Sequence, residues 1–273
     1  MGHCRVRRVA LAVLGACTAV AGVVASIGVP SDAVSRWVPT ASSRFQLVLS
    51  NTPSATQLRG PFTVMELDGF DTPASVVTSL HGLGKRAVCY IDVGTWENWR
   101  SDAKSFPRKV LGKPDQGWPG ERWLDIRQQG VLLPIMAARF SRCVKKGFDA
   151  VDPDNVDGYE NASGFPLTGV EQLSYDRAIA SLAHRDGLAV ALKSDPDEAR
   201  ALQPDFDFVV QEQCVQYAQC AELASFVANH KAVFDIEYTT SLEFCSSLPS
   251  GFEGLAKHLS LDAWVRWCPA PAG

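Results

Sequence analysis

Short runs of apolar, β-branched and aromatic residues recur along the chain, separated by segments with the apolar spacing of helices. This alternation is typical of βα units arranged around a parallel sheet. Eight such runs predict strands at residues 45–51, 63–68, 87–93, 148–154, 189–195, 208–213, 232–238 and 261–265. Because eight parallel strands close a barrel, the pattern predicts a single-domain α/β fold of the (β/α)8 TIM-barrel class.

The first residues have the layout of an export signal. A basic start, Met1-Gly-His-Cys-Arg-Val-Arg-Arg8, precedes an uncharged run over residues 9–30. We assign residues 1–30 to a signal peptide, or to a lipoprotein signal and linker, since Leu14-Gly-Ala-Cys17 resembles a box that receives a lipid on Cys17. An uncleaved anchor helix is the third alternative. Each of them places the folded part outside the cytoplasm, secreted or lipid-anchored at the outer face of the cell membrane.

The rest of the chain has the length of one barrel. About 245 residues follow the signal segment, close to the roughly 250 of a (β/α)8 barrel. We place the barrel domain at residues 40–268. The formal charge of −4 shows no basic excess, which argues against a nucleic-acid partner, and this mild acidity suits a neutral or cationic ligand. We expect a monomer.

Six cysteines remain in the mature region, an even number that in an exported protein favours disulfides over metal ligation. Of the fifteen connectivities that six cysteines allow, we favour Cys89–Cys143, Cys214–Cys220 and Cys245–Cys268. Sequence alone does not choose among them.

Acidic residues fall at the ends of successive predicted strands. In a (β/α)8 barrel the carboxyl ends of the strands build the active site, so these side chains are expected to converge on one cleft. Some of them have an alternative use as turn or helix N-cap residues, because Asp is a common cap. The acids at these positions are Asp68, Asp92, Asp152, Asp154, Asp195, Glu212 and Glu237.

Histidine and metal chemistry find little support in the sequence. His81, His184, His230 and His258 all precede predicted strands, which places them at the amino-terminal face, away from the expected cleft. A zinc site or a Ser-His-Asp triad needs imidazole in the cleft. The run of residues 152–158 is rich in Asp, but its spacing fails the EF-hand pattern, although another calcium arrangement stays open. We therefore predict neither a metal nor a cofactor.

Carboxylates without histidine or metal favour glycoside hydrolysis, in which one acid protonates the departing oxygen while a second acts as nucleophile or as base toward water. Carboxyl groups about 5 Å apart give retention of configuration, and about 6.5 to 9.5 Å gives inversion. Acids from the fourth and sixth strands can meet either distance.

Several motifs, in register from about residue 45 to 238, together resemble glycoside hydrolase family 114, the endo-α-1,4-polygalactosaminidases. They are Cys89-Tyr-Ile-Asp-Val-Gly-Thr-Trp-Glu-Asn-Trp-Arg100, Gly117-Trp-Pro-Gly-Glu-Arg-Trp-Leu-Asp-Ile-Arg127, Gly147-Phe-Asp-Ala-Val-Asp-Pro-Asp-Asn-Val-Asp-Gly-Tyr159, Gly164-Phe-Pro-Leu167 and Glu212-Gln-Cys214. Three positions depart from the family's pattern: Asp152 stands where the family usually has Glu, Lys193-Ser194-Asp195 replaces Lys-Asn-Asp, and the first strand lacks a usual Trp.

The resemblance implies a (β/α)8 barrel that cleaves α-1,4-linked galactosamine polymers internally, with retention. Carried onto this chain, it makes Asp154 the nucleophile and Glu212 the acid/base, with Asp157 as second choice for the strand-four acid. Lys193 is expected to lower the pKa of Asp154, or else to pair with Asp195. Trp96, Trp99 and Trp118 are candidates for stacking on sugar rings or for packing their own loop. We assign substrate binding to Asp68, Asp92, Trp96, Asp152, Asn155, Asp157, Lys193, Glu237 and Tyr238.

Two other functions stay open at this point. One is a non-catalytic polysaccharide-binding barrel at the cell surface, which would bind chains without shortening them. The other is a hydrolase on the same fold with a different substrate, such as another α-linked hexosamine or a galactan. In each case the expected partner is an extracellular polysaccharide.

Overall fold

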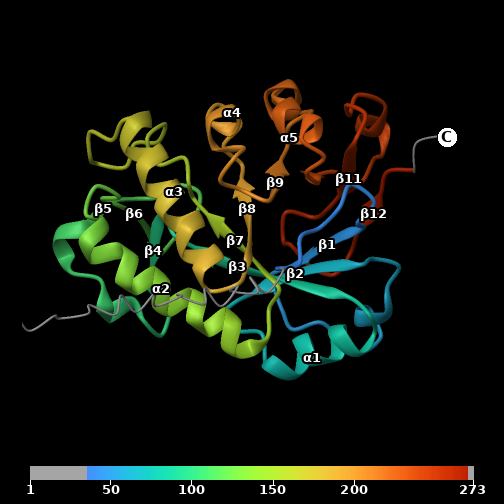
Figure 1. Cartoon of the computed structure of the whole chain (residues 1–273), viewed down its shortest axis with the longest axis horizontal. Helices are drawn as coiled ribbons and strands as arrows, with labels where there is room; N and C mark the ends of the chain where they lie inside the picture. Colours follow the sequence, from blue (N-terminus) through green and yellow to red (C-terminus); the bar gives the residue numbers. More distant parts are fainter. Residues whose placement is uncertain (1–35, 270–273) are drawn as a thin grey trace, which may run out of the picture. The chain divides into compact units, whose positions relative to one another are not determined.

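A computed structural model describes residues 36–269, which form a strongly curved sheet with helices on its outer side (Figure 1). Eight strands run parallel in the order β1-β2-β3-β7-β8-β9-β10-β11, and a ninth, β12, adds antiparallel to β11. The strands are β1 (Phe45–Val48), β2 (Val64–Asp68), β3 (Arg86–Asp92), β7 (Ala150–Asp154), β8 (Ala189–Lys193), β9 (Phe208–Glu212), β10 (Val233–Glu237), β11 (Phe252–Ala256) and β12 (Arg266–Trp267). The architecture is that of the predicted TIM-barrel class.

The helices differ in length around the sheet. The connections after β2, β3 and β7 carry α1 (Ala74–Gly82), α2 (Gln129–Lys146) and α3 (Gly169–Arg185). The later connections carry only short α4 (Ala199–Leu202) and α5 (Ala224–Ala228). Local sequence fixes the long helices: Thr168 and Glu171 form a capping box at the start of α3, and α2 ends where Gly147 takes the left-handed φ of 89°. The remaining short helices are η1 (Gln57–Arg59), η2 (Ala103–Ser105), η3 (Arg108–Val110), η4 (Cys220–Leu223) and η5 (Glu243–Ser246).

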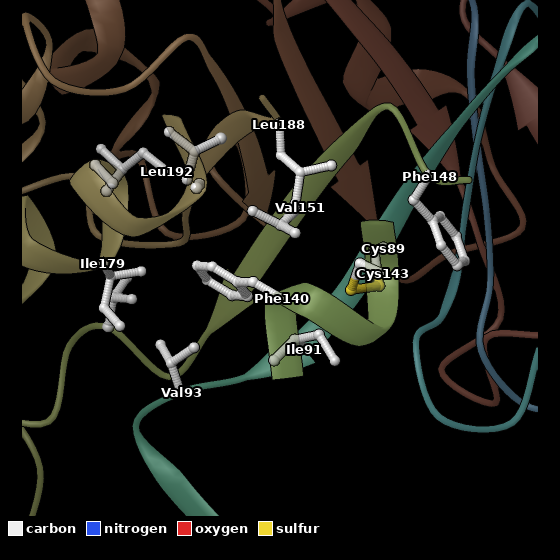
Figure 2. Close-up of a cluster of buried hydrophobic side chains, with 14 of the residues drawn as sticks. Cys89, Ile91, Val93, Phe140, Cys143, Phe148, Val151, Ile179, Leu188 and Leu192 are labelled. Carbon is white, nitrogen blue, oxygen red and sulfur yellow. A yellow bond between two sulfur atoms is a disulfide. The ribbon is translucent and has the colours of Figure 1, made fainter. Parts of the chain in front are cut away.

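Strand alternation divides the buried side chains into two layers. One cluster lies between the sheet and its helices, and Figure 2 shows Phe140 of α2 among Ile91, Val151 and Ile179. A second cluster fills the inside of the curved sheet, where the rings of Phe45 and Phe234 stack with centroids 4.5 Å apart. Inward positions are therefore apolar toward the amino ends of the strands, and they become polar toward the carboxyl ends.

All three predicted disulfides are confirmed: Cys89–Cys143, Cys214–Cys220 and Cys245–Cys268. The first joins β3 to α2 inside the outer apolar layer (Figure 2). The second closes the short loop after β9, and the third ties η5 to the end of β12. Each one anchors a connection of the barrel rather than a distant part of the chain.

The prediction of the eighth strand was wrong. Residues 261–265 are not a strand, and β11 (Phe252–Ala256) takes the eighth place instead. The segment 257–267 returns across the gap to β1, where the Leu49 amide donates to the Leu261 carbonyl and the Trp267 indole to the Phe45 carbonyl. The buried Lys257 ammonium bonds Gln46 Oε1 and two carbonyls of this segment. The segment thus joins the two edges of the sheet: its end, β12, pairs with β11, and its contacts with β1 are single hydrogen bonds.

The long connection after β3 is ordered by a small sheet of its own. Strands β4 (Thr95–Glu97), β5 (Leu111–Pro114) and β6 (Glu121–Leu124) pair antiparallel in the order β4-β6-β5. Gly94, at its start, has no space for a side chain, because a Cβ there would lie 1.7 Å from the Asn155 carbonyl oxygen. This extra sheet stands beside the carboxyl ends of β3 and β7.

The predicted signal segment of residues 1–30 and the lipid-bearing Cys17 lie outside the described residues. Among helices within residues 36–269, none has the length and apolar character needed to cross a bilayer. The domain limits at residues 40–268 stay a prediction.

Candidate active site

A cavity of about 490 Å³ opens at the carboxyl ends of the strands. Seven acidic side chains but only two basic ones line it, so its field is negative. The acids are Asp68, Asp71, Glu97, Glu121, Asp154, Asp157 and Glu212, and the bases are Arg100 and Lys193. Arg100 is committed to ion pairs with Asp68, Glu97 and Asp71, whereas Lys193 is the basic side chain of the lining that faces Asp154 and Glu212.

Asp154 and Glu212 meet at Lys193. The Lys193 ammonium, at the end of β8, lies 3.1 Å from Asp154 Oδ1 and 3.7 Å from Glu212 Oε1. The two carboxylate oxygens are therefore at most about 7 Å apart, within the range that places two carboxyls around one glycosidic bond. Both side chains point to the same end of the barrel.

Each of these two carboxylates also accepts a hydrogen bond from a tyrosine. Tyr90 of β3 donates to Asp154 Oδ2 at 2.6 Å, and Tyr238, just past β10, donates to Glu212 Oε1 at 2.6 Å. Each carboxylate thus contacts a hydroxyl donor of its own and the shared ammonium. Such contacts lock rotamers, and a site that must place reacting groups accurately needs them locked.

The backbone turns sharply just after three of the strands at this end. Asn155, Ser194 and Gln213 have φ of 60°, 41° and 59°, in the left-handed region that non-glycine residues seldom enter. They directly follow Asp154, Lys193 and Glu212. Backbone strain of this kind gathers at functional sites, where surrounding contacts hold it in place. The Ser194 hydroxyl supports the turn by accepting a bond from the Glu212 amide.

The charges in the cavity set the protonation of Asp154. Burial alone would raise its pKa, but the Lys193 ammonium and the Tyr90 hydroxyl outweigh burial and hold the pKa below its ordinary value. Burial likewise opposes the charge on Lys193, whereas Asp154, Glu212 and Asp152 raise its pKa well above the ordinary value. Asp154 is thus ionised and Lys193 is protonated near neutral pH. No ion pair forms between Lys193 and Asp195, which was the alternative role.

Seven of the eleven predicted site residues line the cavity. They are Asp68, Asp154, Asn155, Asp157, Lys193, Glu212 and Tyr238. Asp68 also has a structural contact, since its carboxylate accepts bonds from two backbone amides and from Arg100. Burial and the neighbouring Asp154 raise the pKa of Asp157 to about 6, so its charge changes close to neutral pH.

Four predicted substrate-binding residues lie outside the cavity lining. Asp92 is buried and holds the start of the inserted sheet through the Gly94 and Thr95 amides. Glu237 accepts from the Val215 and Gln216 amides, and so shapes the loop after β9. Trp96 donates its indole N–H to the Ala103 carbonyl and packs on the outer core. Asp152 is fully buried beneath Lys193.

Other residues that line the cavity were missing from the predicted catalytic and substrate-binding set. Trp99 and Trp118, which the sequence offered only as candidates for stacking or for loop packing, lie at the rim in place of Trp96, and each is half-exposed. Tyr90 stands two residues before Asp92 on the same face of β3, and this period-two spacing was the available signal. Glu97 and Glu121 come from the inserted sheet, and Leu259 and Leu261 from the returning segment. Asp195 bonds Tyr159 and does not line the cavity.

Three of the histidines make structural side-chain contacts. His81 and His184 pair with Asp149 and Asp207 next to the amino ends of the strands, as expected of that face. The placement of His258 was wrong, because it follows β11 and so lies at the carboxyl end, where its ring stacks on Trp264 and bonds Asp262. Within residues 36–269, no group of three or more acidic, His or Cys side chains is arranged to hold a metal ion.

Comparison with known proteins agrees with this architecture. The chain is 31% identical to the Aspergillus fumigatus protein Ega3, whose crystal structure is a complex with galactosamine; the match has a TM-score of 0.80 and covers 85% of this chain and 97% of that one. The glycoside hydrolase domain of PelA from Pseudomonas aeruginosa is 16% identical, with a TM-score of 0.64 and coverage of 81% and 96%, a likeness of fold alone. No curated protein sequence matches significantly.

The sequence model of glycoside hydrolase family GH114 matches residues 28–272. This span includes the whole described barrel and every residue of the cavity lining. The chain therefore belongs to glycoside hydrolase family GH114.

Proposed function

We propose that this protein is an endo-acting, retaining glycosidase that cleaves α-1,4-linked galactosamine-containing polysaccharide, with Asp154 as nucleophile and Glu212 as acid/base. The observation that carries the proposal is the single ammonium of Lys193 between the two carboxylates, 3.1 and 3.7 Å away. It keeps Asp154 ionised and both groups at one end of the barrel.

The reaction follows from the different duties of the two acids. In the first step the Glu212 carboxylic acid gives its proton to the glycosidic oxygen while Asp154 attacks the anomeric carbon, and the bond to the leaving sugar breaks. In the second step the Glu212 carboxylate takes a proton from water, which displaces Asp154 from the sugar. Lys193 and the Tyr90 hydroxyl hold Asp154 in its ionised form for the attack.

The acidic cavity supports a cationic sugar as the substrate. Galactosamine carries an ammonium group when it is not acetylated. Asp71, Glu121 and Asp157 line the cavity, and within residues 36–269 the nearest cation to any of the three is Arg100, 3.5 Å from Asp71. A negative field also speeds the encounter with a polycation. Trp99 and Trp118 offer half-exposed rings at the rim for stacking on sugar faces. The galactosamine found with Ega3 is in keeping with this substrate class.

We further propose that the protein acts outside the cytoplasm, secreted or held by a lipid on Cys17, and that it acts as a monomer. Three disulfides support an oxidising compartment. The basic start and the uncharged run of residues 9–30 support export.

The test is to incubate the protein with de-N-acetylated and fully N-acetylated α-1,4-galactosaminan and to read product lengths by mass spectrometry. We expect short oligosaccharides from the de-N-acetylated polymer. Asp154→Asn and Glu212→Gln should each slow cleavage by about 10²- to 10⁴-fold or more. Asp149→Asn is the matched control, because it removes a carboxylate that pairs with Arg86 and His81 at the opposite face.

Binding of the polymer without shortening by the wild-type protein would instead indicate a polysaccharide-binding barrel. Full activity of either active-site variant would refute the assigned roles.

A further inference from the structure

Two fully buried acids lie deeper in the barrel than the proposed catalytic pair, and no N–H or O–H group of the other described residues donates a hydrogen bond to them. Glu66 of β2 and Asp152 of β7 are both 0% exposed. Within the described residues, none of their four carboxylate oxygens accepts a hydrogen bond from an N–H or O–H group. The nearest cation, Lys193, stays 3.7 Å from Asp152 Oδ2, which is an ion-pair contact without a short hydrogen bond. The reaction described above uses neither acid.

The barrel geometry brings these two side chains together. Inward residues of alternate strands share a layer of a (β/α)8 barrel, and β2 and β7 are the second and fourth strands in the sheet order. A side-chain hydrogen bond with Glu66 is one of the contacts that lower the pKa of Asp152 against the effect of burial. The charged groups that face Glu66 are Asp152, Lys193, Asp154 and Glu212, in that order of influence. The single cation among them is shared by all four acids.

Holding two ionised carboxylates in contact here would raise the free energy of the folded state by a large amount. Each one would lose its hydration and would repel the other in a medium of low polarity. One proton between them removes the repulsion and gives one oxygen of each group a partner. Burial, with the charge of Asp152, raises the pKa of Glu66 well above its ordinary value, and burial raises the pKa of Asp152 to about 7. Glu66 is thus the acid that keeps the proton.

We propose that Glu66 is a positioning residue: as a neutral carboxylic acid it donates its proton to Asp152, and this contact leaves the Lys193 ammonium directed at Asp154 and Glu212. The proposal rests on the function proposed above for Asp154 and Glu212. The hydrogen bond from Glu66 spreads the negative charge of Asp152 and reduces its pull on Lys193. Without that bond, Asp152 is a bare buried carboxylate that draws the ammonium down, away from the catalytic pair.

The experiment compares Glu66→Gln with Glu66→Met in the full chain. Gln keeps a hydrogen-bond donor for Asp152, whereas Met keeps the size but removes the donor. We expect Glu66→Gln to retain kcat within about threefold and Glu66→Met to lose kcat by about tenfold or more with little change in KM, because the ammonium moves and the sugar contacts do not. Withdrawal of Lys193 raises the pKa of Asp154, so the acid limb of the kcat/KM profile shifts to higher pH in Glu66→Met only.

An infrared measurement gives a readout that does not depend on activity. Burial also raises the pKa of Asp92 and Asp176 well above the ordinary value, so the readout is the difference spectrum between the wild type and Glu66→Gln near neutral pH. This difference should contain the carbonyl stretch of one buried, protonated carboxylic acid. The proposal is overturned if the difference spectrum lacks this band, or if the Gln and Met variants share one pH profile. If the wild type cleaves no galactosaminan, the proposed function fails while the band still tests the protonation of Glu66.

Discussion

Replacing Lys193 by Met tests how far one ammonium organises the site. The nitrogen lies 3.1 Å from Asp154 Oδ1, and at an effective dielectric of about 20 such a pair attracts by about 5 kcal/mol, part of which desolvation of Lys193 offsets. A neighbouring cation lowers a carboxyl pKa by about 1 to 3 units in proteins, so its removal should raise the pKa of Asp154 by a similar amount.

The sign of the expected change follows from the role of Asp154 as the group that must be ionised. In the wild type the pKa of Asp154 lies below its ordinary value, so the acid limb of the kcat/KM profile lies at low pH. In Lys193→Met that limb should move up by about 1 to 3 pH units, and the rate should fall about tenfold for each pH unit below the new limb.

The assay is the rate of galactosaminan cleavage across pH, with thermal unfolding measured alongside. Lys231→Met is the control, because Lys231 bonds the carbonyls of Gln203 and Phe206 just before β10, at the amino-terminal face. It should lose stability and keep the wild-type pH profile. An acid limb that does not move in Lys193→Met would refute the coupling between Lys193 and Asp154.

Two further predictions concern stability. Removing the Cys89–Cys143 disulfide, which spans 54 residues, should lower the free energy of unfolding by about 4 kcal/mol. Removing Cys214–Cys220, which spans 6 residues, should lower it by about 2 kcal/mol. Denaturant titration of the two double-Ala variants checks this order, and equal losses would contradict it. Burial would raise the pKa of Asp207, but hydrogen bonds from His184 and Arg36 lower that pKa to about 2. The ionised Asp207 therefore stabilises the folded state by about 2 kcal/mol above pH 4, and this contribution is lost as the pH falls toward 2. The stability gap between wild type and Asp207→Asn should therefore narrow over that range, and a constant gap would count against the pairing.

Much of the fold could be predicted, because apolar runs mark most of the strands and acidic residues mark the carboxyl ends of many of them. Parallel strands share a carboxyl edge, so acids that end β2, β3, β7, β9 and β10 had to gather at one end. The eighth strand escaped prediction because residues 252–256 read Phe-Glu-Gly-Leu-Ala, with an acid and a glycine inside, while residues 261–265 have the more strand-like composition. The neighbour of this strand at the join of the sheet is the two-residue β12, and this short pairing tolerates that weak composition.

The candidate site was predicted less well because sequence gives a residue's strand but not what covers it. Asp92 and Glu237 end strands as Asp154 and Glu212 do, yet folded loops bring backbone amides onto their carboxylates and close them off. Which tryptophan reaches the rim depends on the pleat of β4, where Trp96 packs against the outer core, and Trp99 lies beyond the strand end. These contacts arise only when the inserted sheet folds.

Azide rescue of two truncated variants tests the central assignment most directly. Glu212→Ala and Asp154→Ala are each given de-N-acetylated galactosaminan oligosaccharide and sodium azide, and NMR reads the configuration of any glycosyl azide. If Asp154 forms the glycosyl-enzyme, azide takes the place of water in Glu212→Ala, attacks that intermediate and yields the α-azide. In Asp154→Ala no such intermediate forms, so azide attacks the α-linked substrate directly and yields the β-azide. Asp154 as nucleophile and Glu212 as acid/base require this opposite pair of products, and the reversed pair, or the same azide from both variants, would contradict these roles.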